Sequence, residues 1–441
     1  MARKRRRLPT EPVSLEITDL SHDGRGVGHH NDKAVFVRGA LPGETVAARL
    51  TGRHRRFDEA LCEEVTNPSP DRVEPPCPWF ERCGGCALQH LEAGAQLKWK
   101  HKRLVDNLER IGGVAPEQWW TPISSDPWHY RRRSRLSVRQ VRAKCRVLVG
   151  FREPRGRYVA DIEDCRVLHP VFGERLMELS NLMGQLSIAD SIPQIETANG
   201  DDSAAMIVRH MEPFSTDDLV LLKRWSDDNG IAIYLQPKGP DTVHLLWPQN
   251  HQLNYRLDEF DLTMNFSPQH FIQVNAKINR ALVSRAVELM ALEADDRVLD
   301  LFCGLGNFTL PLATRAGRVT GVEGEPALIE AARKNAEHNG IDNADWAVAD
   351  LTADVSNQEW YRAGFDAVLI DPPRSGALEV LPVIASSGAR RVVYVSCNPA
   401  TLARDAGELV DRHGFRLSGA GIADMFPHTA HTESIALFER P

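Results

Sequence analysis

The stretch Val298-Leu-Asp-Leu-Phe-Cys-Gly-Leu-Gly-Asn-Phe308 decides the fold class of the chain. It begins with a short apolar run, which predicts a buried strand over residues 297–301. Gly304 and Gly306 follow directly, and glycines at a strand-to-helix turn let the backbone approach a ligand closely. The stretch therefore predicts a ligand-binding turn at the carboxyl edge of an open α/β sheet.

The residues around this stretch alternate between helical and strand patterns. Strands are expected at 297–301, 318–322, 346–348, 365–370 and 391–395, and helices at 276–292, 307–315, 326–339 and about 377–388. Strands that alternate with helices of this length specify a parallel, doubly wound sheet. We therefore expect a Rossmann-like α/β domain over residues 265–441.

The first part of the chain has a different pattern. Short alternating runs, at 13–17, 34–37, 45–50 and 59–65, are separated by Gly and Asp turns. Such closely spaced strands predict a five-stranded barrel of the oligonucleotide-binding (OB) kind within residues 1–75. Prolines from Pro68 to Pro78 form an extended connector. Residues 76–264 remain as a central domain of mixed α and β character, with one long helix over 91–111.

The charges of the 441-residue chain are unevenly placed around a formal total of −7. Residues 1–7 carry five basic side chains and no acid, and residues 131–157 carry eleven basic side chains and one acid, Glu153. A polyanion-binding enzyme needs such a separation. The alternative is a solvated face. Aromatic residues near the second run favour RNA as the partner, as do residues 53–57 of the barrel, where arginines flank His54 and Phe57.

No stretch has the pattern of an export signal or a membrane span. Residues 8–20, after the basic start, are broken by prolines and acids where a secretory signal needs an unbroken apolar run. No apolar run approaches the about 20 residues of a membrane-spanning helix. We expect a cytoplasmic monomer with no DNA or membrane partner, whose eight cysteines are kept reduced.

The end of the second predicted strand bears on the cofactor. Glu323 stands there, and an acid at this position hydrogen-bonds ribose hydroxyls. A Gly-x-Gly turn alone is weak, because many α/β proteins need tight turns. Thr309 occupies the position of the third glycine of a dinucleotide fingerprint, and Leu301-Phe-Cys-Gly304 resembles motif I of S-adenosylmethionine-dependent methyltransferases. S-adenosylmethionine is therefore favoured over NAD.

Two further strand ends carry chemistry to the same edge. Strand four ends in Asp371-Pro-Pro-Arg374, where arginine replaces the aromatic residue of enzymes that methylate exocyclic amino groups. Strand five ends in Val395-Ser-Cys-Asn-Pro399, which places the thiol of Cys397 beside the cofactor site. The alternative for a free cysteine is a buried apolar residue. Amino methylation is disfavoured, and a cysteine nucleophile is favoured.

Uracil chemistry gives such a nucleophile a purpose. Carbon 5 of uracil attacks a methyl sulfonium only after a thiolate has added to carbon 6. A base must then remove the carbon-5 proton so that the thiol can leave. His428, His431 and Glu433 are candidates for that base, and composition alone does not choose among them.

These motifs resemble the RNA uracil-5-methyltransferase family, in particular its members that modify 23S ribosomal RNA. The resemblance covers nearly the whole chain, and the amino-terminal barrel resembles a TRAM domain. It rests on the segments 266–275, 300–308, 370–374, 396–399, 426–429 and 433–434. It implies methylation of carbon 5 of one uridine through a covalent adduct at carbon 6. Because the thiol must approach a face of the base that stacking covers, we expect this uridine in a single-stranded or locally unfolded RNA segment.

The resemblance also implies roles for individual residues. Cys397 is the implied nucleophile and Glu433 the implied proton-abstracting base. The implied cofactor contacts are Gln273, Phe302, Asn307, Glu323, Asp350 and Asp371.

Four other cysteines suggest a metal site. Cys77, Cys83 and Cys86 are separated by five and two residues, and Cys165 lies downstream. Four thiolates suit either zinc or an iron–sulfur cluster. The long first gap and Gly84-Gly85 favour [4Fe-4S], with zinc and no metal as alternatives. The resemblance implies a [4Fe-4S] cluster on these four cysteines. The expected fold is therefore a Rossmann-like methyltransferase domain with an OB-like (TRAM) barrel and a central α+β iron–sulfur domain.

Three other functions are weighed against the leading one. An RNA cytosine-5 methyltransferase also uses a strand-five cysteine, but those enzymes resemble one another in a cysteine after the strand-four Pro-Pro, where this chain has Arg374. A uracil-5 methyltransferase that acts on tRNA is the second alternative. The third is a non-catalytic iron–sulfur RNA-binding module, which is opposed by the presence of Gly304, Gly306, Glu323 and Cys397.

Overall fold

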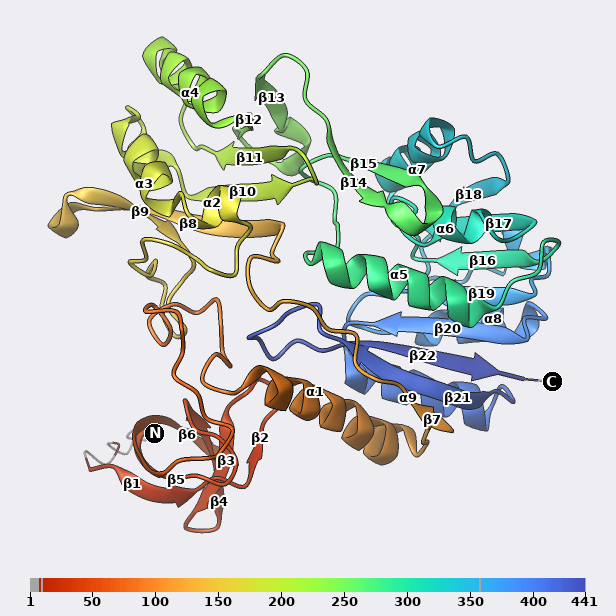
Figure 1. The fold of residues 1–441 in the computed structure, drawn as a ribbon, viewed down its shortest axis with the longest axis horizontal. Coiled ribbons are helices and arrows are strands. Elements are labelled where there is room, and N and C mark those ends of the chain that lie inside the picture. Colours follow the sequence, from red (N-terminus) through yellow and green to blue (C-terminus); the bar gives the residue numbers. More distant parts are fainter. Residues whose placement is uncertain (1–7, 9–10, 357, 441) are drawn as a thin grey trace, which may run out of the picture. The chain divides into compact units, whose positions relative to one another are not determined.

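The computed structural model describes residues 8, 11–356 and 358–440, which form two compact units (Figure 1). The first unit contains the residues up to Lys100, with Arg152–Arg157 and Pro427–His431. The second contains His101–Phe151, Tyr158–Phe426 and the residues from Thr432 onward. The basic residues 1–7, predicted to contact RNA, lie outside the described residues. Across the described part of the chain, no helix combines the length and the apolarity that crossing a membrane requires.

The amino-terminal part of the first unit is a six-stranded sheet that closes on itself. Its strands are β1 (Val13–Glu16), β2 (Asp19–Leu20), β3 (Gly26–His30), β4 (Lys33–Arg38), β5 (Thr45–Arg53) and β6 (Phe57–Asn67). The order is β1-β5-β6-β4-β3-β2, so β1 and β2 are the outermost strands, and only Ile17 and Thr18 lie between them. The N–H of Thr18 donates to the Val27 carbonyl of β3 at 2.8 Å, and β1 also contacts β3, which brings the two edges together. The predicted barrel is present, with six strands instead of five. A strand as short as β2, with two residues, shows no alternating pattern in the sequence from which it could be predicted.

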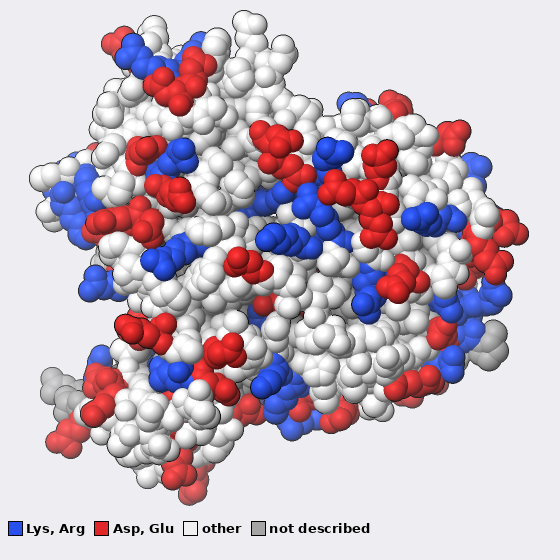
Figure 2. Space-filling model, in the orientation of Figure 1, with Lys and Arg blue, Asp and Glu red and all other residues white. Residues whose placement is uncertain are grey.

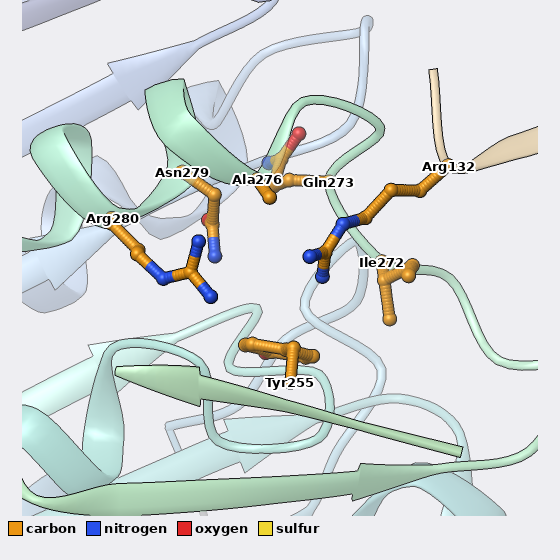
Figure 3. A pocket seen from close by; sticks show the side chains of 7 residues that line it. All are labelled: Arg132, Tyr255, Ile272, Gln273, Ala276, Asn279 and Arg280. Atoms are coloured by element: carbon orange, nitrogen blue, oxygen red, sulfur yellow. The ribbon is translucent and has the colours of Figure 1, made fainter. Parts of the chain in front are cut away.

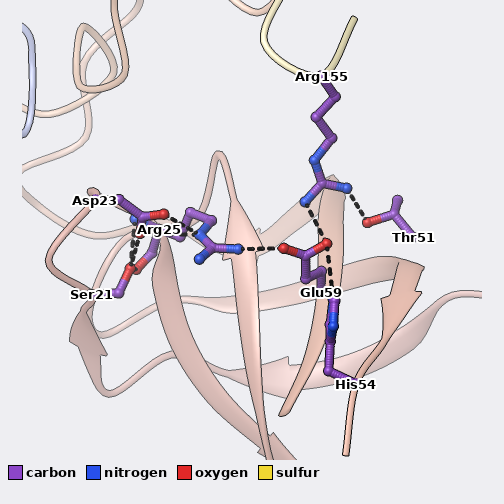
Figure 4. A network of polar contacts seen from close by, with 7 residues as sticks. All are labelled: Ser21, Asp23, Arg25, Thr51, His54, Glu59 and Arg155. Atoms are coloured by element: carbon purple, nitrogen blue, oxygen red, sulfur yellow. Dashed lines mark hydrogen bonds and ion pairs between the residues drawn. The ribbon is translucent and has the colours of Figure 1, made fainter.

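The barrel is held by an apolar interior and by ion pairs on its outside. Its core contains Leu15, Ile17, Val35, Val37, Ala40, Val46, Ala48, Leu50 and Ala60. On the outside, one Glu59 carboxylate oxygen accepts a hydrogen bond from Arg25 at 3.0 Å (Figure 4). The other lies 3.6 Å from both Arg155 and His54. Arg155, part of the basic run expected to face RNA, is therefore paired on the barrel.

The rest of the first unit is built around a buried glutamine in α1 (Ala93–Asn107), whose residues up to Lys100 belong to this unit. The side-chain amide of Gln96 donates to the carbonyls of Leu88 (3.1 Å) and Leu91 (2.8 Å), and its oxygen accepts from the His428 N–H (3.0 Å). The His428 carbonyl accepts from the N–H groups of Ala87 and Leu88. These bonds explain why Pro427–His431 belongs to the first unit.

The second unit contains the predicted Rossmann-like sheet. Its helices are α5 (Ala276–Met290), α6 (Thr309–Ala313), α7 (Pro326–His338), α8 (Leu381–Ser386) and α9 (Pro399–Asp411). Its strands are β7 (Gln118–Trp119), β16 (Arg297–Leu301), β17 (Arg318–Glu323), β18 (Ala344–Val348), β19 (Ala367–Ile370), β20 (Arg391–Ser396), β21 (Arg416–Ala423) and β22 (Glu433–Glu439). The eight strands have the order β18-β17-β16-β19-β20-β22-β21-β7 (Figure 1).

The parallel part of this sheet agrees with the prediction. Three further strands, β22, β21 and β7, which were not predicted, extend the sheet beyond β20. Strands β16 to β20 are parallel to one another, whereas β22 pairs antiparallel with β20 and with β21. β7 then pairs with β21. A side chain at position 419 would place its Cβ 2.3 Å from the Trp120 indole. The absence of a side chain at Gly419 therefore allows the Trp120 ring to pack on β21.

A second sheet and a hairpin complete this unit. The six-stranded sheet has the order β13-β12-β11-β10-β8-β9, and β14 pairs with β15. The strands are β8 (Arg133–Val141), β9 (Arg146–Gly150), β10 (Gln194–Asn199), β11 (Ala204–Arg209), β12 (Ile231–Gln236), β13 (His244–Trp247), β14 (Leu253–Leu257) and β15 (Leu262–Phe266). The helices are α2 (Pro170–Gly173), α3 (Leu176–Gln185) and α4 (Thr216–Asn229).

The long helix predicted over 91–111 ends differently from a regular α-helix. After α1 the chain forms a π turn over Leu108–Gly112, and Gly113 closes it with a φ of 65°. A Cβ on Gly112 would lie 2.4 Å from the Ala403 carbonyl oxygen of α9. Gly112 therefore permits close packing of this turn on α9.

The prediction of a central iron–sulfur domain is wrong. Within the described ranges, no three His, Cys, Asp or Glu side chains gather as a group that could hold a metal ion. A metal site needs its thiolates within about 2.3 Å of one point, whereas spacing counts residues only along the chain. Here Cys77, Cys83 and Cys86 belong to the first unit and Cys165 to the second. All four cysteines are half-buried, and Cys83 accepts a hydrogen bond from the Gly85 N–H at 3.4 Å.

Candidate active site

The turn after β16 has the backbone of a ligand-binding loop. Phe302, Gly304 and Gly306 have φ values of 65°, 56° and 94°. Such a conformation is rare and strained for a bulky residue such as phenylalanine, and strain of this kind clusters at functional sites. A Cβ on Gly304 would meet no atom within 4 Å, whereas one on Gly306 would lie 3.3 Å from Leu310 and Trp346. Gly304 therefore borders open space, and Gly306 is packed.

Glu323 joins the end of β17 to this turn. Its carboxylate accepts hydrogen bonds from the backbone N–H groups of Gly304 (3.2 Å), Gly324 (2.7 Å) and Glu325 (3.1 Å). These donors fix the half-buried carboxylate beside the open space at Gly304. The geometry suits an acceptor for ribose hydroxyls, as the position of Glu323 predicts.

Asp300 is a buried acid that the sequence analysis left without a role. It is fully buried within β16, and one carboxyl oxygen accepts a hydrogen bond from the Thr309 hydroxyl at 2.5 Å. Burial, with the charges of Asp371 and Glu323, raises the pKa of Asp300 to about 8. Its other oxygen, Oδ1, has no hydrogen-bond partner among the described residues. An acid inside an apolar strand is the sequence signal that could have identified it.

A pocket beside α5 brings Gln273 near Asn307. It is lined by Arg132, Tyr255, Ile272, Gln273, Ala276, Asn279 and Arg280 (Figure 3). The Asn307 side chain exchanges two hydrogen bonds of 3.0 Å with Asn279. Its oxygen also accepts from the Tyr255 hydroxyl at 2.8 Å. Asn279 and Tyr255 therefore connect the turn after β16 to the pocket wall that contains Gln273.

Three arginines of the predicted RNA-binding run, Arg131, Arg132 and Arg133, have partners within the second unit. Arg132 pairs with Asp201, which also accepts from Arg280 at 2.8 Å, and the two guanidinium groups point toward each other across the pocket (Figure 3). Arg133 donates to the Gln269 carbonyl at 2.9 Å. The Arg131 guanidinium lies 5.9 Å from the centre of the Phe426 ring. Basic side chains also lie beside acidic ones over much of the face shown in Figure 2.

Asp350 lies at the same edge of the sheet as Glu323. β18 pairs with β17 so that Val348 stands opposite Glu323, and Asp350 follows. Its carboxylate accepts from the N–H (2.9 Å) and hydroxyl (2.7 Å) of Thr352, which lowers the pKa of Asp350. The structure thus places this exposed acid in a turn at the carboxyl end of β18.

The ends of β20 and β22 bring Cys397 and Glu433 together. The antiparallel register of these strands ends with Ser396 opposite Ser434, so the next pair along it is Cys397 and Glu433. Burial, Glu433 and Asp371 raise the pKa of the Cys397 thiol to about 11, and Arg374 acts against them. Burial and Asp371 likewise raise the pKa of Glu433, which is 2% exposed. These four side chains therefore form one electrostatically coupled site.

The three candidate bases have different surroundings. Burial and Lys100 lower the pKa of His428 to about 4, and its Nδ1 lies 3.3 Å from the Gln96 amide nitrogen. His431 is exposed, and its backbone N–H donates to the Thr429 hydroxyl at 3.3 Å. Glu433 interacts with Cys397 directly through its charge. The geometry therefore favours Glu433 among the three.

Comparison with known proteins identifies the family of the chain. Residues 249–441 match the tRNA (Uracil-5-)-methyltransferase family, and residues 8–60 match the TRAM domain. A 23S rRNA (uracil(1939)-C(5))-methyltransferase RlmD from Alkalilimnicola ehrlichii is 52% identical over 100% of this chain and 99% of its own length. The RlmD protein of Xanthomonas oryzae pv. oryzae is 51% identical over the full length of both chains.

A solved structure has the same fold over nearly the whole chain. It is the crystal structure of the Pyrococcus abyssi tRNA (uracil-54, C5)-methyltransferase in complex with S-adenosyl-L-homocysteine. It is 27% identical and covers 97% of this chain and 100% of its own, with a TM-score of 0.75. Together with the full-length relatives, this similarity shows that the chain belongs to the RNA (uracil-C5)-methyltransferase family that contains the RlmD enzymes.

Proposed function

We propose that this enzyme methylates carbon 5 of a uridine in 23S ribosomal RNA, with Cys397 as the nucleophile and Glu433 as the base. The observation that carries the proposal is that Cys397 and Glu433 directly follow the last pair of β20 and β22, Ser396 with Ser434, and interact through their charges. The names of the relatives that are about 50% identical over the whole chain support ribosomal RNA as the substrate.

The side chains at this site suit the chemistry. The Cys397 thiolate adds to carbon 6 of the uracil, and the electron pair of the ring double bond becomes an enolate that is nucleophilic at carbon 5. Asp371, whose charge acts on the Cys397 thiol, takes up the thiol proton, so that Glu433 stays ionised for the later step. After methyl transfer, Glu433 removes the carbon-5 proton, and the thiolate leaves as the ring double bond reforms. A carboxyl group whose pKa is raised toward neutrality is a stronger base than an ordinary glutamate.

The turn after β16 suits S-adenosylmethionine, which supplies an electrophilic methyl group when bound. Open space at Gly304 and the partnerless Oδ1 of Asp300, among the described residues, are the features that fit such a ligand. Glu323 accepts from ribose hydroxyls, Gln273 acts from the pocket beside α5, and Asn307 is held by Tyr255 and Asn279 of the pocket lining. The residues that we propose to hold the cofactor are Gln273, Phe302, Asn307, Glu323, Asp350 and Asp371.

The two ends of the chain divide the work in this proposal. The barrel within residues 1–75 binds RNA, residues 265–441 carry the reaction, and residues 76–264 lie between them in the sequence. The target uridine is in a single-stranded or locally unfolded segment, because a thiol must approach a face of the base that stacking covers. We expect the enzyme to work as a monomer in the cytoplasm, where ribosomal RNA is its substrate.

Nucleoside analysis of RNA after reaction with labelled S-adenosylmethionine tests the proposal. The parent protein should convert a 23S ribosomal RNA transcript to a product with 5-methyluridine. Cys397→Ala should abolish transfer and keep cofactor binding, and Glu433→Gln should accumulate a denaturation-resistant protein–RNA adduct. An adduct that persists in Cys397→Ala and is absent from Glu433→Gln would reverse the assignment.

Transfer RNA is the second candidate substrate, because the Pyrococcus abyssi neighbour is a tRNA (uracil-54, C5)-methyltransferase. A tRNA transcript in the same assay separates the two substrates. Faster methylation of tRNA than of ribosomal RNA, or a product with 5-methylcytidine, would contradict the proposed function.

A further inference from the structure

Asp405 is a buried carboxylate for which the proposed reaction has no use. It lies in α9, the helix that starts directly after Cys397 and Asn398, and its side chain is fully buried. A buried carboxylate is costly unless polar partners surround it. The partners of Asp405 therefore indicate what this acid does.

The Asp405 carboxylate joins three segments of the second unit. One oxygen, Oδ2, accepts from the Ala377 N–H and from the Tyr394 hydroxyl, each at 2.7 Å. The other accepts from Arg404 Nε at 2.8 Å. Tyr394 lies in β20, shortly before Cys397, and Ala377 lies in the loop that follows β19. Through one side chain, that loop is fixed to β20 and to α9.

The same loop is also held by neighbours of Asp405 in α9. Arg404 donates to the Ser375 carbonyl at 3.0 Å. The Arg374 carbonyl accepts from the Asn398 side chain at 3.0 Å and from the Thr401 hydroxyl at 3.4 Å.

Gly376 allows this contact to be close. It has a φ of 87°, and a Cβ there would lie 2.6 Å from both Arg404 Nη2 and Asp405 Oδ2. Loop 371–377 therefore rests on α9 with no room for a side chain between them.

We propose that Asp405 is a positioning residue that holds loop 371–377 against α9 and so fixes the Arg374 side chain relative to Cys397. Asp405 itself acts only through the loop. The inference rests on the proposed role of Cys397. Asp371 depends less on this contact, because it directly follows β19 and its N–H donates to the Leu301 carbonyl at 3.4 Å.

Three charged groups face Cys397: Glu433 from β22, and Asp371 and Arg374 from the loop after β19. The two acids disfavour the thiolate, and Arg374 favours it. If the loop loosens at Arg374, the titration midpoint of Cys397 should move to higher pH. Direct removal of a nearby negative charge would move it to lower pH, and a general loss of stability would leave it unchanged. The direction of the shift therefore distinguishes the three explanations.

Alkylation of Cys397 by iodoacetamide, followed by mass spectrometry across a pH series, measures this midpoint. In Asp405→Asn we expect it to rise by about half a pH unit or more, which slows alkylation at neutral pH about threefold. The exposed Cys145 in the same digest is the internal control. We expect kcat for methyl transfer to fall by up to about 100-fold, with KM for S-adenosylmethionine within about twofold of the parent value, since misplacement at the reacting centre affects chemistry more than cofactor binding.

Two further variants keep the test decisive. Tyr394→Phe removes one donor from the same carboxylate, so it should shift the midpoint in the same direction by less, even if Asp405→Asn folds poorly. Leu409→Ala opens a cavity elsewhere in buried α9 and should leave the midpoint unchanged. An unchanged or lowered midpoint in Asp405→Asn would overturn the inference. Undiminished methyl transfer by Cys397→Ala would instead overturn the proposed function. The titration midpoint of Cys397 in Asp405→Asn would still test the positioning role of Asp405.

Discussion

At the scale of single residues, the buried carboxyl of Glu433 makes stability depend on pH. Burial and Asp371 raise its pKa above the ordinary value of 4.5. A raised carboxyl pKa stabilises the fold fully below the unfolded value, and this contribution is lost as pH rises toward the folded value. Between about pH 5 and pH 8.5 the parent should therefore lose stability that Glu433→Gln retains.

Urea unfolding of both proteins at several pH values checks this expectation. The free energy of unfolding of the parent should fall relative to that of Glu433→Gln by about 1 to 3 kcal/mol across this range. Asp300 titrates in both proteins, so the difference reports Glu433 together with its interaction with Asp371. If the free energy of unfolding changed with pH equally in the two proteins, Glu433 would be ionised in the folded protein over the whole of this pH range.

Residues could be predicted from sequence where a strand end or a motif exposes them. Cys397 and Glu323 stand at strand ends, and the structure places both at the expected edge of the sheet. Asp300 and Asp405 could not be assigned in the same way. Their importance comes from burial and from partners such as Thr309 and Tyr394, which are distant in sequence and meet them only in the folded chain.

At the scale of elements, the π turn over Leu108–Gly112 should tolerate no side chain at its end. In Gly112→Ala the new methyl group would overlap the Ala403 carbonyl of α9. We expect a loss of about 1 to 3 kcal/mol in the free energy of unfolding, as overpacking usually costs. Ile111→Ala, at a side chain that is 52% exposed, should change stability by no more than about 0.5 kcal/mol. Equal denaturation midpoints for the two variants would contradict this expectation and show that α9 shifts to accommodate the new methyl group without loss of stability.

Regular elements were predictable to the extent that they repeat a pattern. The alternation of strands and helices after residue 265 identified the five parallel strands, because strand-length and helix-length segments follow one another regularly there. β2 and β7 are two residues long and have no period to detect. The antiparallel direction of β22 depends on how β21 returns to the sheet, which the local sequence does not encode.

At the scale of the whole molecule, a chain with a formal charge of −7 needs local basic clusters to bind RNA. The turn between β5 and β6 is such a cluster: Arg53, Arg55 and Arg56 are exposed, and the His54 ring stacks on Phe57 with centroids 4.4 Å apart. Replacing the three arginines with glutamine should weaken RNA binding and reduce its salt dependence. Each lost contact to single-stranded RNA lowers the log–log slope by about 0.7.

Filter binding at several salt concentrations measures this slope. The matched control replaces three exposed arginines of the second unit with glutamine: Arg224 in α4, Arg333 in α7 and Arg412 directly after α9. The control has the same change in net charge and should keep the parent slope. Equal slopes in both variants would show that overall charge, and not the barrel turn, governs binding.

The metal prediction failed at this same scale. The spacing of Cys77, Cys83 and Cys86 matches a ligand motif locally, but a site also needs its thiolates to converge in three dimensions. The fourth predicted ligand, Cys165, belongs to the other unit. Convergence of side chains depends on the path of the whole chain, so spacing along the sequence could not establish it.

The pairing of β7 with β21 has a consequence for self-association. A shortened protein that began at residue 249, where the family match starts, would lack Gln118–Trp119 and the Trp120 ring that lies over Gly419 and Gly421. β21 would then be an open edge with bare backbone donors and acceptors, which can recruit a strand from another copy. The early residues around Trp120 thus cover an edge of the catalytic sheet that would otherwise be open to a strand from another copy.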